Sequence, residues 1–328
     1  MPSKPQRCRH LGVSGPRTMP EHGGTAAGDG GHHRAGTAAI AGRPNVGKST
    51  LLNALMGVKL AIVTPRPQTT RNRIAGIKTT AEAQFIFLDT PGIHDSRGGL
   101  NRRLVSIARR AMAEADVVLL VIDSGCGIAR QDREIAANLT AAKKPTVAIL
   151  NKMDLIPRAQ LLPLMETMGN LVPGIDIVPV SALKNENIGT VLGVICKLLP
   201  LGPPLRPANS VTDQTECFIA QETIREKVFQ LTHAEVPYAA AVMVEDFLER
   251  KPSPPRRPLL YIRATILIER PSQKAIVIGE RGQRLKEIGR RARLELEGFL
   301  GKRVFLELHV KVEPGWDTNP TVLHGIGL

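Results

Sequence analysis

The feature that most constrains the fold is the segment Gly42–Ser49, GRPNVGKS, which fits the phosphate-loop pattern GxxxxGK[ST]. It follows residues 36–41, a short apolar run typical of a buried parallel strand, and helical sequence begins near Thr50. Such a loop joins a strand to a helix because its backbone N–H groups and the helix dipole must both face phosphate oxygens. The predicted phosphate contacts are Gly42, Arg43, Pro44, Asn45, Val46, Gly47, Lys48, Ser49 and Thr50.

A second polar segment, Asp89-Thr90-Pro91-Gly92, follows the strand-like residues 83–88. Ligands gather at the carboxyl ends of strands in open α/β sheets, so this segment is expected beside the phosphates together with Lys48. We expect Asp89 to hold Mg²⁺ through water, the Ser49 hydroxyl to ligate it, and the Gly92 N–H to meet a γ-phosphate. The structural alternative is an ordinary β-turn, because the same four residues are good turn formers.

Residues 64–73 carry prolines and no apolar period, which is typical of a long loop. One threonine of the pair Thr69 and Thr70 is expected to reach Mg²⁺ when GTP is bound. We favour Thr70, and the sequence leaves Thr69 open. The predicted metal ligands are therefore Ser49, Thr70 and Asp89.

Further apolar strands at 116–122, 144–150 and 177–180 alternate with helical stretches at 100–114 and 130–142. This alternation predicts an α/β fold with a doubly wound parallel sheet. Asn151-Lys152-Met153-Asp154 comes at the end of one strand. An aspartate there can accept from N1–H and the N2 amine of guanine, which adenine does not offer. The pattern predicts GTP and GDP as ligands, contacted by Asn151, Lys152, Asp154, Ser181, Ala182 and Leu183.

The carboxyl-terminal third contains a GxxG turn, Gly279–Gly282, between two helical stretches. Around it we expect a helix at 217–231, strands at 238–247 and 259–268, the two helices, and a strand at 304–311. This α-β-β-α-α-β order predicts a smaller α+β domain, a type II KH domain that binds single-stranded RNA. The arginine run between Arg281 and Arg293 could instead form a solvated helix face, because glutamates are interleaved with the arginines. The predicted RNA contacts are Gly279, Glu280, Arg281, Gly282, Arg284 and Lys286.

Together these segments resemble the TRAFAC-class GTPases, and Gln68–Arg71 with Asp89–Gly92 is most similar to the Era family of ribosome-associated GTPases. The resemblance spans about residues 37–316. It implies a GTPase that binds small-subunit (16S-type) rRNA near its 3′ end and assists small ribosomal subunit maturation. Hydrolysis should be intrinsically slow, because Ile93 stands where Ras-like enzymes place a water-orienting glutamine.

Within the resemblance, Asn45 matches an asparagine that coordinates K⁺ in related GTPases, although it could instead only cap the loop. The implied catalytic residues are Asn45, Lys48, Thr70 and Gly92. Two alternatives stay open. One is a constitutive RNA tether with incidental hydrolysis. The other is a regulatory GTPase associated peripherally with the inner face of the plasma membrane through residues 100–114, a basic and amphipathic stretch.

Composition predicts a polyanionic partner, either nucleic acid or an anionic membrane, because 328 residues carry a formal charge of +14 and a pI near 10.1. The four cysteines lack CxxC spacing, which predicts free buried thiols and no zinc site. No apolar stretch is long enough to cross a bilayer, so we do not expect a membrane-spanning protein. We expect a cytoplasmic protein and, separately, a monomer. An organellar transit peptide is the less favoured interpretation of the Arg-rich start.

The predicted domain boundaries follow from these motifs and from shifts in composition. Residues 1–35 are expected to be a disordered extension and 36–200 the GTPase domain. Residues 201–212 are expected to form a stiff, proline-rich linker, 213–313 the KH domain and 314–328 a tail. Residues 251–258 are expected to form a hairpin loop within the KH domain.

Overall fold

The computed structural model describes residues 33–64, 66, 69–93, 99–233, 235–250 and 259–328. The chain divides into two compact units with the boundary between Asp213 and Gln214, and each is described by itself. Across the described residues, no helix is both long and apolar enough to span a membrane.

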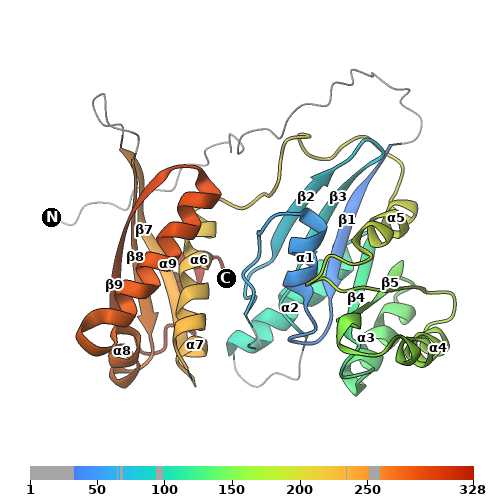
Figure 1. The fold of residues 1–328 in the computed structure, drawn as a ribbon, viewed down its shortest axis with the longest axis horizontal. Helices are drawn as coiled ribbons and strands as arrows, with labels where there is room; N and C mark the ends of the chain where they lie inside the picture. Colours follow the sequence, from blue (N-terminus) through green and yellow to red (C-terminus); the bar gives the residue numbers. More distant parts are fainter. Residues whose placement is uncertain (1–32, 65, 67–68, 94–98, 234, 251–258) are drawn as a thin grey trace. The chain divides into compact units, whose positions relative to one another are not determined.

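The first unit is a six-stranded sheet covered by helices on both faces (Figure 1). The sheet order is β2-β3-β1-β4-β5-β6. Its strands are β1 (Arg34–Ala41), β2 (Ile74–Thr79), β3 (Ala83–Asp89), β4 (Val117–Asp123), β5 (Thr146–Asn151) and β6 (Asp176–Pro179). Its helices are α1 (Lys48–Met56), α2 (Gly99–Glu114), α3 (Arg130–Ala141), α4 (Leu161–Leu171) and α5 (Ile188–Leu198), with 3₁₀ turns η1 (Met153–Leu155) and η2 (Arg158–Gln160).

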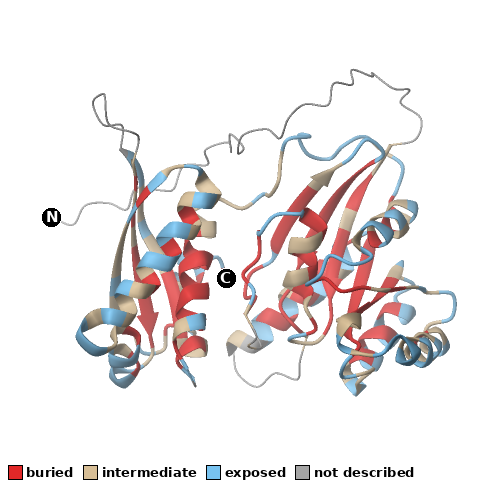
Figure 2. Ribbon diagram, viewed as in Figure 1, coloured by how far each residue is buried: buried red, intermediate tan, exposed pale blue. Residues whose placement is uncertain are grey.

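The central strands are almost completely buried, which explains their continuous apolar sequence (Figure 2). One core cluster joins β4 and β5 to α3 and α4, through Leu120, Leu150, Ile135 and Met168 among others. The predicted doubly wound phosphate-loop domain is confirmed. One strand escaped prediction: β2 pairs antiparallel with β3, which makes the sheet mixed rather than wholly parallel.

Residues 201–212, which were expected to form a stiff linker, are hydrogen-bonded to the first unit. Gln84 in β3 exchanges two hydrogen bonds with the backbone of Arg206, each 2.8 Å. The Ile77 N–H donates to the Val211 carbonyl at 2.8 Å, and the Thr212 hydroxyl donates to the Ala75 carbonyl at 2.6 Å. Since β2 is an edge strand, these contacts cover its open side.

The second unit is a three-stranded sheet in the order β7-β8-β9, with helices packed on it. Its elements are α6 (Glu216–Leu231), α7 (Val236–Ala239), β7 (Ala240–Arg250), β8 (Leu259–Ile268), α8 (Pro271–Ile278), η3 (Glu280–Gly282), α9 (Gln283–Leu300), β9 (Arg303–Val312) and α10 (Pro320–Gly325). Strands β7 and β8 are antiparallel, and β8 and β9 are parallel. The predicted KH order is confirmed, except that 236–239 form a short helix before β7 begins.

The tail after β9 packs into the second unit. Trp316 is 1% exposed, and its indole N–H donates to the Ala239 carbonyl at 2.8 Å. Farther along, Leu323 and Ile326 are buried, and the Gln221 side chain of α6 donates to the Ile326 carbonyl at 3.3 Å. The tail is therefore part of this unit's core.

Some predictions fall outside the described residues or are corrected. Most of the expected disordered extension (residues 1–32), the expected hairpin loop at 251–258, and Cys8 lie outside them. Cys126, Cys196 and Cys217 form no disulfide among the described residues, but Cys126 is exposed and Cys196 and Cys217 are half-buried. The prediction that these thiols are buried was wrong, because each lies on a loop or on a helix face that the core does not cover.

Candidate nucleotide site and RNA-binding turn

A cavity of about 500 Å³ opens over the phosphate loop. The loop leaves β1 and enters α1, as its sequence predicts. Gly47 has φ +96°, and a Cβ there would lie 2.2 Å from the Asn151 amide nitrogen, so only glycine fits. The cavity is also lined by residues 62–64 and 69–70, by Gly92 and by Lys152. It therefore gathers loops that are far apart in the sequence.

The phosphate end of the cavity is built around two buried charges. Burial lowers the pKa of Lys48 to about 8, while Asp89 opposes this shift. Burial likewise raises the pKa of Asp89, against hydrogen bonds from Ser49 and Thr70 and the charge of Lys48. The Lys48 ammonium donates to the Arg43 carbonyl at 2.7 Å. Phosphate oxygens near Lys48 would favour its charged form.

Ser49, Thr70 and Asp89 converge on one point. The Ser49 Oγ lies 2.6 Å from Asp89 Oδ2 and 2.8 Å from the Thr70 Oγ1, which is 3.3 Å from the same carboxylate. Thr69 points elsewhere, since its hydroxyl donates to the Arg66 carbonyl and lies 2.6 Å from the Thr64 hydroxyl. The hydroxyl of Thr70, and not that of Thr69, therefore lies beside Ser49 and Asp89, a distinction that the sequence alone did not make.

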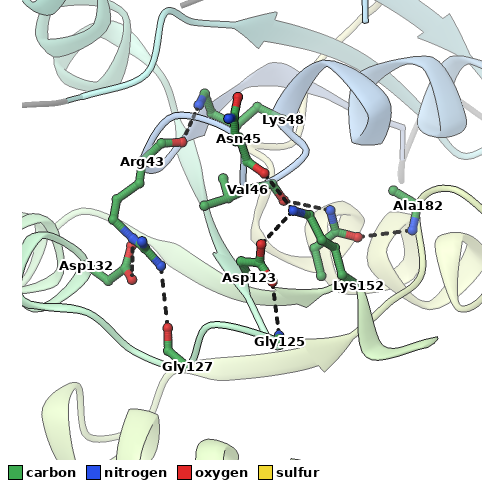
Figure 3. Close-up of polar contacts among 11 residues, drawn as sticks. Arg43, Asn45, Val46, Lys48, Asp123, Gly125, Gly127, Asp132, Lys152 and Ala182 are labelled. Atoms are coloured by element: carbon green, nitrogen blue, oxygen red, sulfur yellow. Dashed lines mark hydrogen bonds and ion pairs between the residues drawn. The ribbon is translucent and has the colours of Figure 1, made fainter. Parts of the chain in front are cut away.

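The base end is held by a hydrogen-bonded frame (Figure 3). The Asn151 side chain donates to the Val46 carbonyl at 2.8 Å and accepts from the Ala182 N–H at 3.1 Å. Lys152 donates to the Asn45 carbonyl at 2.7 Å and pairs with Asp123 at 2.5 Å. These bonds tie the ends of β4 and β5 to the phosphate loop.

The other predicted base contacts surround this frame. Asp154 lies in η1, and the ammonium of Lys184 is 3.9 Å from its carboxylate. The Ser181 hydroxyl accepts from the Lys184 N–H at 3.3 Å. Leu183, two residues further on, is 78% exposed.

Arg43 is turned away from the phosphates. Its guanidinium donates to Asp132 of α3 at 2.8 Å and to the Gly127 carbonyl at 3.4 Å (Figure 3). Only the Arg43 backbone faces the site, through the carbonyl that accepts from Lys48. The Arg43 side chain therefore fixes the outside of the loop.

The segment after β3 packs tightly against the phosphate loop. A Cβ on Gly92 would lie 2.8 Å from the Pro44 nitrogen, and the Ile93 N–H donates to the Gly42 carbonyl at 3.2 Å. The Thr90 hydroxyl donates to the Ile40 carbonyl at 2.8 Å, and Pro91 is buried beside it. Movement of this segment is thus coupled to the loop that holds phosphate.

In the second unit, the GxxG turn joins α8 to α9. Gly279 and Gly282 have φ +72° and +78°, and Arg281 between them is also left-handed at +49°. Glu280, Arg281 and Lys286 are exposed. Arg284 instead donates to the Ile276 carbonyl at the end of α8, which stabilises the turn. Of the four charged side chains predicted to contact RNA, Arg284 is thus committed to the protein.

Most of the other arginines of α9 are compensated. Arg290 binds Glu287 through two nitrogens at 2.8 Å, and Arg291 binds the same carboxylate at 2.6 Å. These bonds lower the pKa of Glu287 to about 2. The solvated-face interpretation therefore holds for this part of the helix.

Two family models match the chain: a 50S ribosome-binding GTPase model over residues 37–152 and a KH domain model over residues 235–317. GTPase Era of Syntrophus aciditrophicus is 47% identical over 294 residues, which cover 90% of this chain and 95% of that protein. This chain belongs to the Era family of GTPases. GTPase Era of Geotalea daltonii is 45% identical over 292 residues, covering 89% and 97%.

Two solved Era structures share the whole architecture. Aquifex aeolicus Era bound to GDP·AlF₄⁻ has a TM-score of 0.85 and 42% identity, over 90% of this chain and 99% of that one. An Era complex with MgGDPNP and nucleotides 1506–1542 of 16S ribosomal RNA has a TM-score of 0.86 and 43% identity, with the same coverage. The predicted Era membership and GTPase activity are confirmed.

Sequence reasoning missed Asp123 and Asp132, which hold Lys152 and Arg43. Asp123 is the last residue of β4, so the rule that functional groups follow the carboxyl ends of strands could have found it. Asp132 carried no such signal, because it lies in the first turn of α3.

Proposed function

We propose that this protein is a GTP-hydrolysing switch that binds the 3′ region of small-subunit rRNA through its KH domain and assists small-subunit assembly in the cytoplasm, as a monomer. The convergence of Ser49, Thr70 and Asp89 beside the phosphate loop carries the proposal. It is supported by the Era complex with MgGDPNP and 16S rRNA, which shares both domains with this chain.

The residues at the phosphate end fit a magnesium ion. Asp89 Oδ1 is buried with no hydrogen-bond partner among the described residues, and two hydroxyls flank its other oxygen. Hydroxyl and carboxylate oxygens are the donors that Mg²⁺ prefers. Ser49 and Thr70 would hold the ion directly and Asp89 through water. When bound, the ion neutralises charge on the β and γ phosphates.

Guanine selection is assigned to Asp154, with Asn151 and Lys152 positioning the surrounding loops. Asp154 has a side chain only 9% exposed beside the base end of the site. A carboxylate there accepts from two guanine donors, and an adenine would leave it unpaired. Ser181, Ala182 and Leu183, of which Ser181 is buried and Leu183 is exposed, form the loop that would contact the base.

Hydrolysis is expected to be slow without a cofactor or partner, because Ile93 cannot orient water. Asn45 is left-handed, with φ +63°, and lies on the rim of the cavity. We assign it the coordination of a potassium ion, which would supply positive charge beside the phosphates. Lys48 and the Gly92 N–H would stabilise the charge that develops on the γ-phosphate.

A route for coupling the two units starts at Thr70. The loop that carries Thr70 leads directly into β2, and the edge of β2 is bonded to residues 211–212, immediately before the second unit. Displacement of this loop when the γ-phosphate leaves would shift β2 and pull on the segment that leads to the KH domain. This is how hydrolysis would change RNA affinity.

The decisive experiment measures GTP hydrolysis in potassium and in sodium buffer, with and without a single-stranded RNA from the 3′ end of small-subunit rRNA. Stimulation by both is expected. A GTP hydrolysis rate that does not change when RNA is added, together with equal RNA affinity in the GTP and GDP states, would favour the constitutive tether.

The structure gives the membrane alternative no specific support. The apolar residues of α2, including Leu104, Val105, Ala108 and Ala111, are buried in the first unit at 8% exposure or less. Membrane insertion of an amphipathic helix requires such residues to be available to lipid.

A further inference from the structure

The net positive charge of the chain lies mainly outside the KH domain. Residues 36–212 contain 21 lysines and arginines and 12 aspartates and glutamates, whereas residues 213–328 contain 18 and 16. Of the lysines and arginines of this unit, only Lys48 is assigned to the phosphates of the nucleotide. The first unit therefore carries positive charge in excess of what its nucleotide site uses.

Part of this excess forms one face of α2, which we call the α2 arginine stripe: Arg102, Arg103, Arg109 and Arg110. At about 100° per residue, the four side chains fall within an arc of roughly 120°. All four are exposed, as are Ser106 and Ala113 between and beyond them, while the opposite face is buried (Figure 2). The stripe is therefore a basic, convex helix surface about 12 Å long.

The stripe has little compensating charge. Arg110 pairs with Glu114 at 2.7 Å, whereas Arg102, Arg103 and Arg109 have no ion-pair partner among the described residues. Helix α9 provides the contrast, because there Glu287 neutralises both Arg290 and Arg291. Uncompensated guanidinium groups at helical spacing create a local field that attracts a polyanion.

We propose that the α2 arginine stripe binds the phosphodiester backbone of structured RNA, outside the single strand that the GxxG turn holds. The two arginine pairs are seven residues apart, or about 10 Å along the helix, so one backbone can engage both. The guanidinium group of an arginine can donate two parallel hydrogen bonds to the oxygens of one phosphate. A lipid surface is disfavoured because the apolar side of α2 is buried. This inference rests on the proposed RNA function for the identity of the polyanion.

The test compares full-length wild-type protein with two triple variants of equal charge. The stripe variant is Arg102→Gln, Arg103→Gln, Arg109→Gln. The control variant is Arg130→Gln, Arg133→Gln, Arg158→Gln, which removes three exposed arginines from α3 and η2. Each is titrated against a structured RNA made of a stem-loop joined to a single strand from the 3′ region of small-subunit rRNA, and against the short single strand alone, over a series of salt concentrations. Binding to vesicles containing phosphatidylglycerol is measured in parallel.

The stripe variant is expected to bind the structured RNA roughly 30- to 100-fold more weakly near 0.15 M salt, with a slope of log K against log salt smaller by about 2 to 3. The affinities of the stripe variant for the short strand and for GTP should equal those of wild type. The control variant should bind the structured RNA, the short strand and GTP with wild-type affinity. If the wild-type protein fails to bind even the short strand, the proposed RNA function is refuted. RNA is then also ruled out as the ligand of the stripe.

Three results would overturn the stripe proposal while leaving the KH function intact. In the first, the stripe variant keeps the wild-type slope. In the second, both triple variants lose affinity equally, so that only total charge matters. In the third, the stripe variant loses binding to vesicles containing phosphatidylglycerol but not to structured RNA, which would make α2 a membrane contact.

Discussion

Asp123→Asn is the most informative single substitution, because Asp123 holds Lys152 and Lys152 holds the phosphate loop. The lysine ammonium donates to the Asn45 carbonyl at 2.7 Å and to Asp123 at 2.5 Å. Asparagine keeps the shape of the side chain and an oxygen to accept from the Gly125 N–H, which lies 3.0 Å away. The change therefore keeps the shape but removes the charge and the hydrogen bond from Lys152, because an amide NH2 replaces the oxygen that accepted from its ammonium.

The expected magnitude follows from the partial burial of the pair. Charge-assisted hydrogen bonds contribute about 1.5–3 kcal/mol. The Asp123 and Lys152 side chains are 11% and 30% exposed, so solvent screening reduces this to about 1–2 kcal/mol. A loss of that size corresponds to roughly 5- to 30-fold weaker binding of both GDP and GTP.

Isothermal titration with GDP and GTP measures the effect, with thermal unfolding as a check on the fold. Asp176→Asn, an exposed carboxylate at the start of β6, is the matched control and should bind like wild type. If Asp123→Asn binds both nucleotides within twofold of wild type, the argument that Lys152 braces the loop through Asp123 is wrong.

The remaining predictions concern the phosphate end and the coupling route. Thr70→Ala should lower the rate of GTP hydrolysis at least about tenfold and reduce the dependence of GTP affinity on Mg²⁺ by a similar factor. Thr69→Ala should stay within threefold of wild type in both assays. Equal effects of the two substitutions would contradict the assignment of Thr70 to the metal. Because burial lowers the pKa of Lys48 to about 8, GDP binding should take up roughly half a proton at pH 8 and about a tenth at pH 7. Calorimetry in buffers of different ionisation enthalpy measures this uptake, and no uptake by Lys48 at either pH would show that it is already fully charged in the free protein. Thr212→Val removes the 2.6 Å bond to the Ala75 carbonyl and should narrow the difference in RNA affinity between GTP and GDP states by up to roughly fivefold; an unchanged difference would exclude the β2 route.

The nucleotide site was predictable where its chemistry is contiguous. The phosphate loop, Asp89–Gly92 and Asn151–Asp154 are each a strand end followed by a fixed pattern, so their residues carry the signal locally. The GxxG turn is equally local, because positive φ at Gly279 and Gly282 demands glycine.

What escaped prediction depends on contacts between distant segments. Thr69 and Thr70 are chemically identical in sequence, and only the loop's path turns one hydroxyl toward Asp89. The side-chain direction of Arg43 is decided by Asp132, 89 residues away. Proline-rich residues such as 201–212 have no apolar period, so nothing in their sequence indicated that they bind the edge of β2.

That last contact changes how the GTPase domain should be delimited. A fragment ending near Pro200 would remove the cover from β2 and leave the Ile77 N–H and the Ala75 carbonyl without the partners they have in residues 211–212. An open edge of this kind is a template for pairing with another chain, and the fragment would tend to associate with itself. In the structure the first compact unit ends at Asp213, so residues 201–212 are part of this unit.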